Sequence, residues 1–119
     1  MAIYQVWENH FSAFGEQNID KIMKDYDEKS IVYVWDHRDN SYCTRVYTGY
    51  NEIRDMFLNL FSILKNLDTL KVNLTEIVDE RSVVFLEWEC KGCGITKAND
   101  IFVFNKETNK FSHQSISVY

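Results

Sequence analysis

Halfway along the sequence, the spacing of the apolar residues changes from a helical to an extended period. In the first half, large apolar side chains recur three and four residues apart, as on one face of a helix. In the second half they alternate with polar residues, as on one face of a strand. Because proline is absent, turns are marked by glycine and by clusters of Asn and Asp. This pattern predicts an α+β fold whose helices cover one face of a curved, mostly antiparallel sheet.

The same spacing predicts where each element lies. Helices are expected over residues 3–15, 18–26 and 51–67, and a two-stranded hairpin over residues 30–36 and 42–49. Four more strands are expected at 70–78, 82–90, 95–105 and 110–119, separated by turn sequences. Asn18 has the position and side chain of an N-cap for the second helix.

Length and charge narrow the range of functions. The 119 residues suit one domain spanning 1–119, with a core large enough to fold without metal or disulfides. The net charge is −5 and Lys and Arg are scattered, so no nucleic-acid-binding face is expected. The longest apolar run, residues 31–35, is too short to span a membrane. The first residues do not resemble a secretion signal, and we expect a cytoplasmic protein.

The three cysteines are an odd number, which fits a reducing compartment better than a set of disulfides. Cys90 and Cys93 form the sequence CKGCG, whose spacing is also found in zinc sites. A structural zinc ion needs four ligands, and the remaining candidates are Cys43, His37, His10 and His113. The plainer interpretation is a glycine-containing hairpin loop flanked by two small thiols, and we expect no metal.

Asp100 leads the alternating stretch KANDIFVFN. On a strand, Asp100 shares one face with Phe102 and Phe104. If that face is buried, loss of water raises the pKa of the carboxyl group, which can then donate a proton or a hydrogen bond near neutral pH. In the alternative interpretation, Asp100 pairs with a nearby base or an exposed amide and only fixes the hairpin.

The order of these elements resembles the nuclear transport factor 2-like superfamily, in particular its SnoaL-like and steroid delta-isomerase-like members. Residues 18–34 (NIDKIMKDYDEKSIVYV) resemble the second helix and first strand of that superfamily. Residues 47–57 (YTGYNEIRDMF) resemble its glycine before the long helix, and 99–116 (NDIFVFNKETNKFSHQSI) its closing hairpin. The resemblance implies a cystatin-like cone: three N-terminal helices packed on a strongly curved, mostly antiparallel sheet around a pocket. It also implies a homodimer through the outer sheet face.

The resemblance further implies site residues. Asp100 matches the acid with which steroid isomerases hold the oxyanion of an enolised ketone, and His10 matches a first-helix tyrosine that shares this role. The proton-shuttling aspartate of those enzymes falls on Val34 here, and Asp36 lies two residues further on the same strand face. His10 and Asp100 would form an acid/base pair if they enter one cavity. In the alternative, His10 is a core histidine satisfied by one hydrogen bond, and Asp36 belongs to a solvated turn with His37, Arg38 and Asp39.

The predicted function is binding of a small apolar organic molecule, with acid/base isomerisation, cyclisation or dehydration of a carbonyl compound as the candidate reaction. No cofactor is required for such chemistry, and no nucleophile, phosphate-binding or dinucleotide-binding motif is present. The rival prediction is a non-catalytic homodimeric association or ligand-carrying module. The expected pocket wall consists of Trp7, Phe14, Val34, Phe57, Phe61, Leu86, Trp88, Phe102, Phe104 and Gln114.

Overall fold

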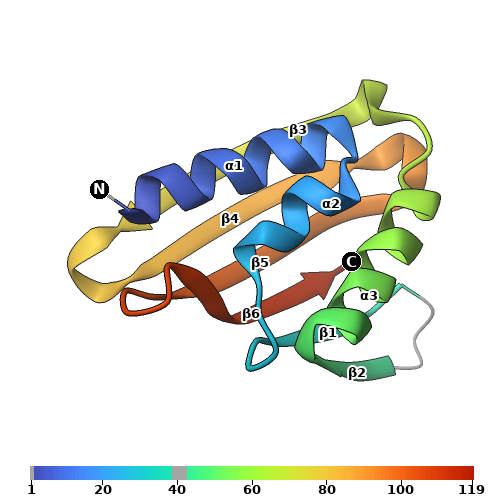
Figure 1. The fold of residues 1–119 in the computed structure, drawn as a ribbon. Coiled ribbons are helices and arrows are strands. Elements are labelled where there is room, and N and C mark those ends of the chain that lie inside the picture. The colour runs from blue at the N-terminus through green and yellow to red at the C-terminus, as the bar shows by residue number, and fades with distance from the viewer. Residues whose placement is uncertain (1, 39–42) are drawn as a thin grey trace.

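The computed structural model describes residues 2–38 and 43–119, which form three α-helices and one six-stranded sheet (Figure 1). The helices are α1 (Ala2–Glu16), α2 (Ile19–Ile22) and α3 (Gly49–Ile63). The strands are β1 (Ile31–Asp36), β2 (Cys43–Thr48), β3 (Leu70–Val78), β4 (Val83–Cys90), β5 (Ile95–Asn105) and β6 (Lys110–Val118). Short 3-10 turns named η1 (Met23–Asp25), η2 (Leu67–Thr69), η3 (Asp79–Arg81) and η4 (Lys91–Cys93) connect them. These elements confirm the predicted α+β class.

The sheet is mixed rather than a simple antiparallel meander. Its strand order is β2-β1-β6-β5-β4-β3, and β6 pairs with β1 in parallel while the other pairs are antiparallel. Three of the antiparallel ladders contain register shifts, including one between Trp88 and Cys90. The helices lie on one side of the sheet, with α1 alongside β3 and β4 and α3 near β1 and β2 (Figure 1). The third helix follows the hairpin, so only two helices are N-terminal to every strand.

Two local features explain where the helices begin. The side chain of Asn18 accepts a hydrogen bond from the backbone N–H of Lys21, which confirms the predicted N-cap of α2. The α3 helix starts at Gly49, whose φ of +82° suits glycine. A Cβ atom there would lie 3.0 Å from Oε2 of Glu28, so this turn favours glycine for reasons of space as well. The helix predicted over residues 18–26 changes to the 3-10 form after Ile22.

Burial along β4 and β5 follows the predicted alternation. Ala98, Asp100, Phe102 and Phe104 are buried on the face that the helices cover, whereas Ile101 between them is 43% exposed. On β4, the buried Val84, Trp88 and Cys90 likewise face the helices. The side chain of Asp100 therefore points toward the core, as its position beside Phe102 and Phe104 predicts.

The core lies between the helices and the inner face of the sheet. Its largest fully buried side chains include Phe57, Phe102 and Phe111. No helix in the described ranges combines the length and the apolar character needed to cross a membrane.

Candidate active site

Asp100 is buried in the middle of the sheet and is held by two neighbouring strands. Its Cα partners are Leu86 on β4 and Ile116 on β6. The indole Nε1–H of Trp88 donates to Asp100 Oδ1 at 3.0 Å, and the amide Nε2 of Gln114 donates to Oδ2 at 3.0 Å. Only 6% of the Asp100 surface is exposed. Both carboxyl oxygens therefore have a fixed donor, and the group has little freedom to rotate.

Tyr26, just after η1, fixes the orientation of Gln114. Its hydroxyl group donates to Gln114 Oε1, so the amide N–H₂ of Gln114 faces Asp100. Burial, together with the carboxyl groups of Asp25 and Asp100, raises the pKa of Tyr26 well above its usual value. Tyr26 therefore stays protonated and acts as a permanent donor. A continuous hydrogen-bond chain runs from Tyr26 through Gln114 to Asp100.

Burial dominates the acidity of Asp100. It raises the pKa of the carboxyl group from its usual value to about 7, although the hydrogen bonds from Trp88 and Gln114 act in the opposite direction. At neutral pH, the protonated and ionised forms are then both populated. The protonated form can donate a hydrogen bond to a carbonyl oxygen, and the ionised form can accept a proton. An acid of this kind is suited to proton transfer near pH 7.

A small apolar pocket adjoins Asp100. Its volume is about 80 Å³, and its walls come from α1, α3, β3, β4, β5 and β6. Since a cavity of about 150 Å³ holds benzene, ligands of drug size would require the pocket to widen. The lining residues are Trp7, His10, Phe11, Phe14, Gly15, Phe57, Leu60, Leu70, Val72, Leu86, Trp88, Asp100, Gln114 and Ile116.

His10 lines the same pocket but is paired with a different acid. Its Nδ1 lies 3.5 Å from Oδ2 of Asp25, and both residues are buried. Neither of these two atoms has a hydrogen-bond partner among the described residues, so this 3.5 Å approach is the polar contact that each of them makes. The imidazole ring stacks on Trp7 and meets the edge of Phe102 at a centroid distance of 5.0 Å. With Nδ1 toward Asp25, Nε2 is the ring nitrogen that is left for the pocket.

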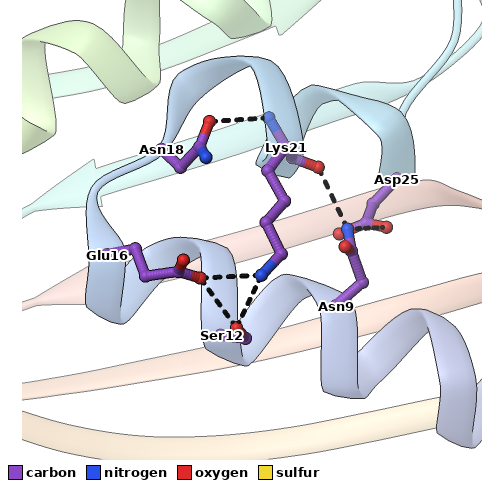
Figure 2. Close-up of polar contacts among 6 residues, drawn as sticks. All are labelled: Asn9, Ser12, Glu16, Asn18, Lys21 and Asp25. Atoms are coloured by element: carbon purple, nitrogen blue, oxygen red, sulfur yellow. Dashed lines mark hydrogen bonds and ion pairs between the residues drawn. The ribbon is translucent and has the colours of Figure 1, made fainter.

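Asn9 holds Asp25 beside His10. The Nδ2 amide of Asn9 donates to the backbone carbonyl of Lys21 at 3.0 Å and to Oδ1 of Asp25 at 3.0 Å (Figure 2). A second set of contacts lies nearby on the surface, where Lys21 Nζ binds Glu16 at 2.7 Å (Figure 2). These contacts tie α1 to α2 and η1, which places the Asp25 carboxyl group opposite Nδ1 of His10.

Most of the predicted pocket wall is found around this cavity. Asp100 and His10 line it, as do the predicted wall residues Trp7, Phe14, Phe57, Leu86, Trp88 and Gln114. Phe61, Phe102 and Phe104 are instead core residues that do not line it. Phe102 lies behind His10, because its ring packs against the imidazole and Trp7. The predicted pairing of His10 with Asp100 is replaced by the His10–Asp25 contact.

Val34 and Asp36 lie at a second cavity of about 240 Å³. Arg38 forms a two-pronged ion pair with Asp36, with Nε 3.0 Å from Oδ1 and an NH2 nitrogen 2.7 Å from Oδ2. The hydrogen bond from Arg38 holds the pKa of Asp36 below its usual range. Asp36, the last residue of β1, is thus an ionised member of an ion pair at the second cavity, and it does not line the pocket at Asp100. Asp39, predicted for the same turn, lies outside the described residues.

The two cavities are neighbours, because Leu60 and Ile116 line both of them. Leu60 comes from α3 and Ile116 from β6, so these side chains form the partition between the cavities. Movement of Leu60 would connect the pocket at Asp100 with the larger cavity that contains Arg38.

Sequence reasoning missed several residues of the site. Asp25 was missed because it is a charged residue at the edge of the apolar stripe of the second helix, and such residues ordinarily face solvent. It is the last residue of η1 and is only 3% exposed. The wall also includes Phe11, Gly15, Leu60, Leu70, Val72 and Ile116, which alternation alone does not separate from ordinary core residues.

The donor groups at this site suit proton transfer rather than metal binding. Within the described residues, no three His, Cys, Asp or Glu side chains gather as a metal site would require. The pocket instead offers one buried acid with a pKa near neutrality, one imidazole, and apolar walls that exclude water.

Comparison with known proteins identifies the fold. No protein-family model matches the sequence, and no curated protein matches it. A cystatin-like fold protein of unknown function from Methylobium petroleophilum PM1 is similar in structure, with a TM-score of 0.74 and 12% identity over 98% of this chain and 75% of that one. A steroid delta-isomerase from Pseudomonas aeruginosa has a TM-score of 0.73 and 9% identity, covering 100% and 80% of the two chains.

A SnoaL-like protein of unknown function from Burkholderia thailandensis E264 has a TM-score of 0.71 and 11% identity, covering 99% of this chain and 95% of its own. Proteins described as NTF2-like and as SnoaL-like polyketide cyclases share the fold as well. The chain therefore has the nuclear transport factor 2-like, SnoaL-like fold, as its sequence predicts. At these identities the likeness concerns the fold, which hosts more than one activity.

Proposed function

We propose that the chain binds a small, largely apolar carbonyl compound next to Asp100 and transfers a proton to or from it. The observation that carries this proposal is the buried carboxyl group at the apolar pocket, with its pKa raised to about 7. An acid donor at a carbonyl oxygen stabilises the negative charge that develops as the carbonyl enolises. The reaction class is isomerisation, cyclisation or dehydration, and the fold's steroid isomerase and polyketide cyclase members support that choice.

His10 is the proposed second proton carrier. It lines the same pocket as Asp100, and Asp25 beside Nδ1 orients the imidazole. Nε2 would then exchange a proton with the substrate while Asp100 holds the carbonyl oxygen. Asp36 has no place in this scheme, because Arg38 keeps it ionised at the second cavity.

The size of the pocket limits the substrate. A volume of about 80 Å³ accepts only a few non-hydrogen atoms, so a one-ring or larger ligand needs movement of Leu60 or Phe11. Phe11 is 47% exposed and Leu60 lines both cavities, so movement of either side chain is the proposed way in which the pocket widens. The register shifts in the sheet support the strong curvature expected of a cone around such a chamber.

Ligand binding is expected to raise the thermal stability of the protein. The test is a thermal-shift measurement with small cyclic and aromatic ketones and with larger steroid or polyketide ketones. Each ketone is compared with its deoxygenated analogue. A ketone present at about 100 times its dissociation constant should stabilise the protein by about 2.7 kcal/mol. The analogue should stabilise it less, because it leaves the protonated Asp100 without an acceptor.

Two variants separate binding from proton transfer. Asp100→Asn keeps an N–H donor and should still prefer the ketone, whereas Asp100→Leu should bind ketone and analogue alike. In D₂O, the wild type should accelerate exchange of the α-protons of a bound ketone, and Asp100→Asn should accelerate it much less, because an amide is a weaker donor than a carboxylic acid to the developing enolate oxygen. If no ketone of the panel raises the melting temperature, the proposed binding of a carbonyl compound is wrong. If a ketone binds but its α-protons do not exchange faster, the protein carries the ligand and does not transfer a proton.

A specific observation favours a second function, association through the outer sheet face. Val46, Tyr33, Ile101 and Phe85 are exposed large apolar residues on strands β2, β1, β5 and β4. They lie in one register row, which Ser115 completes between Tyr33 and Ile101. A row of this kind across a sheet is suited to packing against the same face of a second copy, as a symmetric dimer requires.

Association through the outer sheet face can be tested by measuring the molecular mass of the protein in solution. We expect sedimentation equilibrium to find twice the chain mass of 14.2 kDa for the wild type, and the monomer mass for Phe85→Lys. The lysine would have to be desolvated in the packed interface. Leu58→Lys is the matched control, because Leu58 is equally exposed at 41% but lies on α3. A monomeric wild type, or a dimeric Phe85→Lys variant, would rule out this interface.

A further inference from the structure

Two thiols lie against each other at the end of β4. Cys90 is the last residue of the strand and Cys93 ends the 3-10 turn η4 that follows it. Both are free cysteines, and their sulfur atoms are 2.9 Å apart. Cys90 is fully buried, whereas Cys93 is partly exposed. Among the described residues, no third His, Cys, Asp or Glu side chain completes a metal site with them.

The pair is attached to the connection between α3 and β3. The thiol of Cys93 donates to the backbone carbonyl oxygen of Asn66 at 3.2 Å, and the single S–H of Cys90, whose Sγ lies 3.7 Å from that oxygen, can donate either to it or to Sγ of Cys93. Thr69 Oγ1 accepts a hydrogen bond from the backbone N–H of Gly92 at 2.8 Å. A Cβ atom at Gly92 would lie 2.8 Å from the same oxygen, so η4 packs directly on η2. The thiols thus help to fasten residues 66–69 to the end of β4.

We propose that Cys90 and Cys93 are a reversible thiol–disulfide pair that reacts with low-molecular-weight disulfides such as oxidised glutathione. The Cys93 thiolate attacks one sulfur of the small disulfide, and one small thiolate leaves. The Cys90 thiolate then attacks Cys93 Sγ, forms the Cys90–Cys93 bond and releases the second small thiolate. The two cysteines lose two protons and two electrons, and the small disulfide takes up both electrons.

Exposure sets the order of the two steps. Cys93 can be reached from solvent, so it is the attacking thiol. Cys90 is buried, so it reacts only in the second step, with Cys93. Burial, together with the hydrogen bond to Cys93, raises the pKa of Cys90. Cys90 alone is therefore a slow nucleophile. Once Cys93 carries a mixed disulfide, the short distance between the two sulfurs makes the second step intramolecular and fast.

Oxidation changes the contacts of the α3–β3 connection. Two sulfurs joined in a disulfide carry no hydrogen, so neither can donate to the carbonyl oxygen of Asn66. Residues 66–69 lead directly into Leu70, which lines the pocket at Asp100 and is the Cα partner of Cys90. We therefore expect amide hydrogen exchange in residues 66–70 to accelerate roughly fivefold in the oxidised protein, as for the loss of about one net hydrogen bond.

The test is treatment of the full chain with oxidised glutathione, followed by acid quenching, alkylation of the remaining thiols and intact mass measurement. The wild type should lose two alkylatable thiols without retaining glutathione, and dithiothreitol should restore both. Cys43→Ser should behave in the same way. Cys90→Ser should stop at a stable glutathione adduct on Cys93, and Cys93→Ser should react at least tenfold more slowly than the wild type. Cys90→Ala replaces Cys90→Ser if the serine variant does not fold.

The proposal is overturned if the wild type keeps a glutathione adduct on Cys93 while Cys90 stays free. It is equally overturned if Cys43→Ser abolishes the loss of two thiols, since Cys43 would then be a partner in the disulfide. A wild type that reacts no faster than Cys93→Ser would also contradict it. None of these readouts depends on a ligand in the pocket, so they stand apart from the proposed function.

Discussion

Replacing Asp100 with Asn should remove most of the pH dependence of stability between about pH 4 and pH 7. In the wild type, burial raises the pKa of this carboxyl group from 3.8 to about 7 in the folded state. Across that window the folded chain holds a proton that the unfolded chain has released. Stability therefore falls as the pH rises, by about 1.4 kcal/mol per pH unit at most. Asn cannot ionise, so the Asp100→Asn variant should lack this slope.

The size of the effect follows from the same shift. Above pH 7, ionisation of Asp100 should make the unfolding free energy of the wild type roughly 2 to 4 kcal/mol lower than at pH 4. Asp100→Asn should then be less stable than the wild type at pH 4, where its amide meets the Gln114 donor, and equal or more stable at pH 8. Urea unfolding at half-unit pH intervals measures how the unfolding free energy of the wild type and of Asp100→Asn depends on pH.

The matched control is Asp20→Asn, because Asp20 is an exposed acid on α2. The unfolding free energy of Asp20→Asn should fall with pH as steeply as that of the wild type. Asp100 is not a desolvated acid if the same steep fall is found for Asp100→Asn, or if the wild type shows no fall in stability between pH 4 and 7.

His10→Phe should cost roughly 1 to 3 kcal/mol of unfolding free energy. The substitution suits the apolar surroundings, since Phe102, Phe57 and Phe111 all meet the imidazole edge to face. It removes, however, the ring nitrogen that lies 3.5 Å from Oδ2 of the buried Asp25 carboxyl group. A buried polar group that loses its polar neighbour has a large desolvation cost. Urea unfolding at pH 6 measures the loss.

A second substitution distinguishes loss of the polar partner of Asp25 from poor packing. Asp25→Asn in the His10→Phe background removes the buried carboxyl group and should recover about 1 kcal/mol of unfolding free energy. His113→Phe, on the exposed surface of β6, should change stability by less than about 0.5 kcal/mol. Equal stability of His10→Phe and the wild type would show that the Asp25 contact contributes nothing.

The strands were largely predictable from the sequence. The β5 strand covers residues 95–105 as expected, because its alternation of apolar and polar residues is long and ends in clear turns. Alternation decides which face a residue occupies but not which strand lies beside it. The parallel pairing of β6 with β1 therefore required the structure. The 3-10 turn after Ile22 could not be predicted either, because three residues are too few to show a spacing of apolar residues different from that of an α-helix.

The site was predictable where strand parity determined it. Asp100, Trp88 and Leu86 followed from alternation, and the structure places all three at the pocket. Which aromatic residues line the cavity and which fill the core depends on packing volumes, so Phe102, predicted for the pocket wall, is instead a core residue that packs against the imidazole of His10. The His10–Asp25 contact depends on how α1 packs on η1, which spacing within either element does not reveal.

The most direct test of the account is the titration of the Asp100 carboxyl carbon, followed by nuclear magnetic resonance in protein labelled at aspartate. Asp100→Asn assigns the signal by its disappearance. We predict a midpoint near pH 7, and a further upward shift when a ketone occupies the pocket, because a ketone oxygen accepts a hydrogen bond only from the protonated acid. A midpoint near 4, unchanged by every ketone that stabilises the protein, would contradict a proton-transfer role for Asp100.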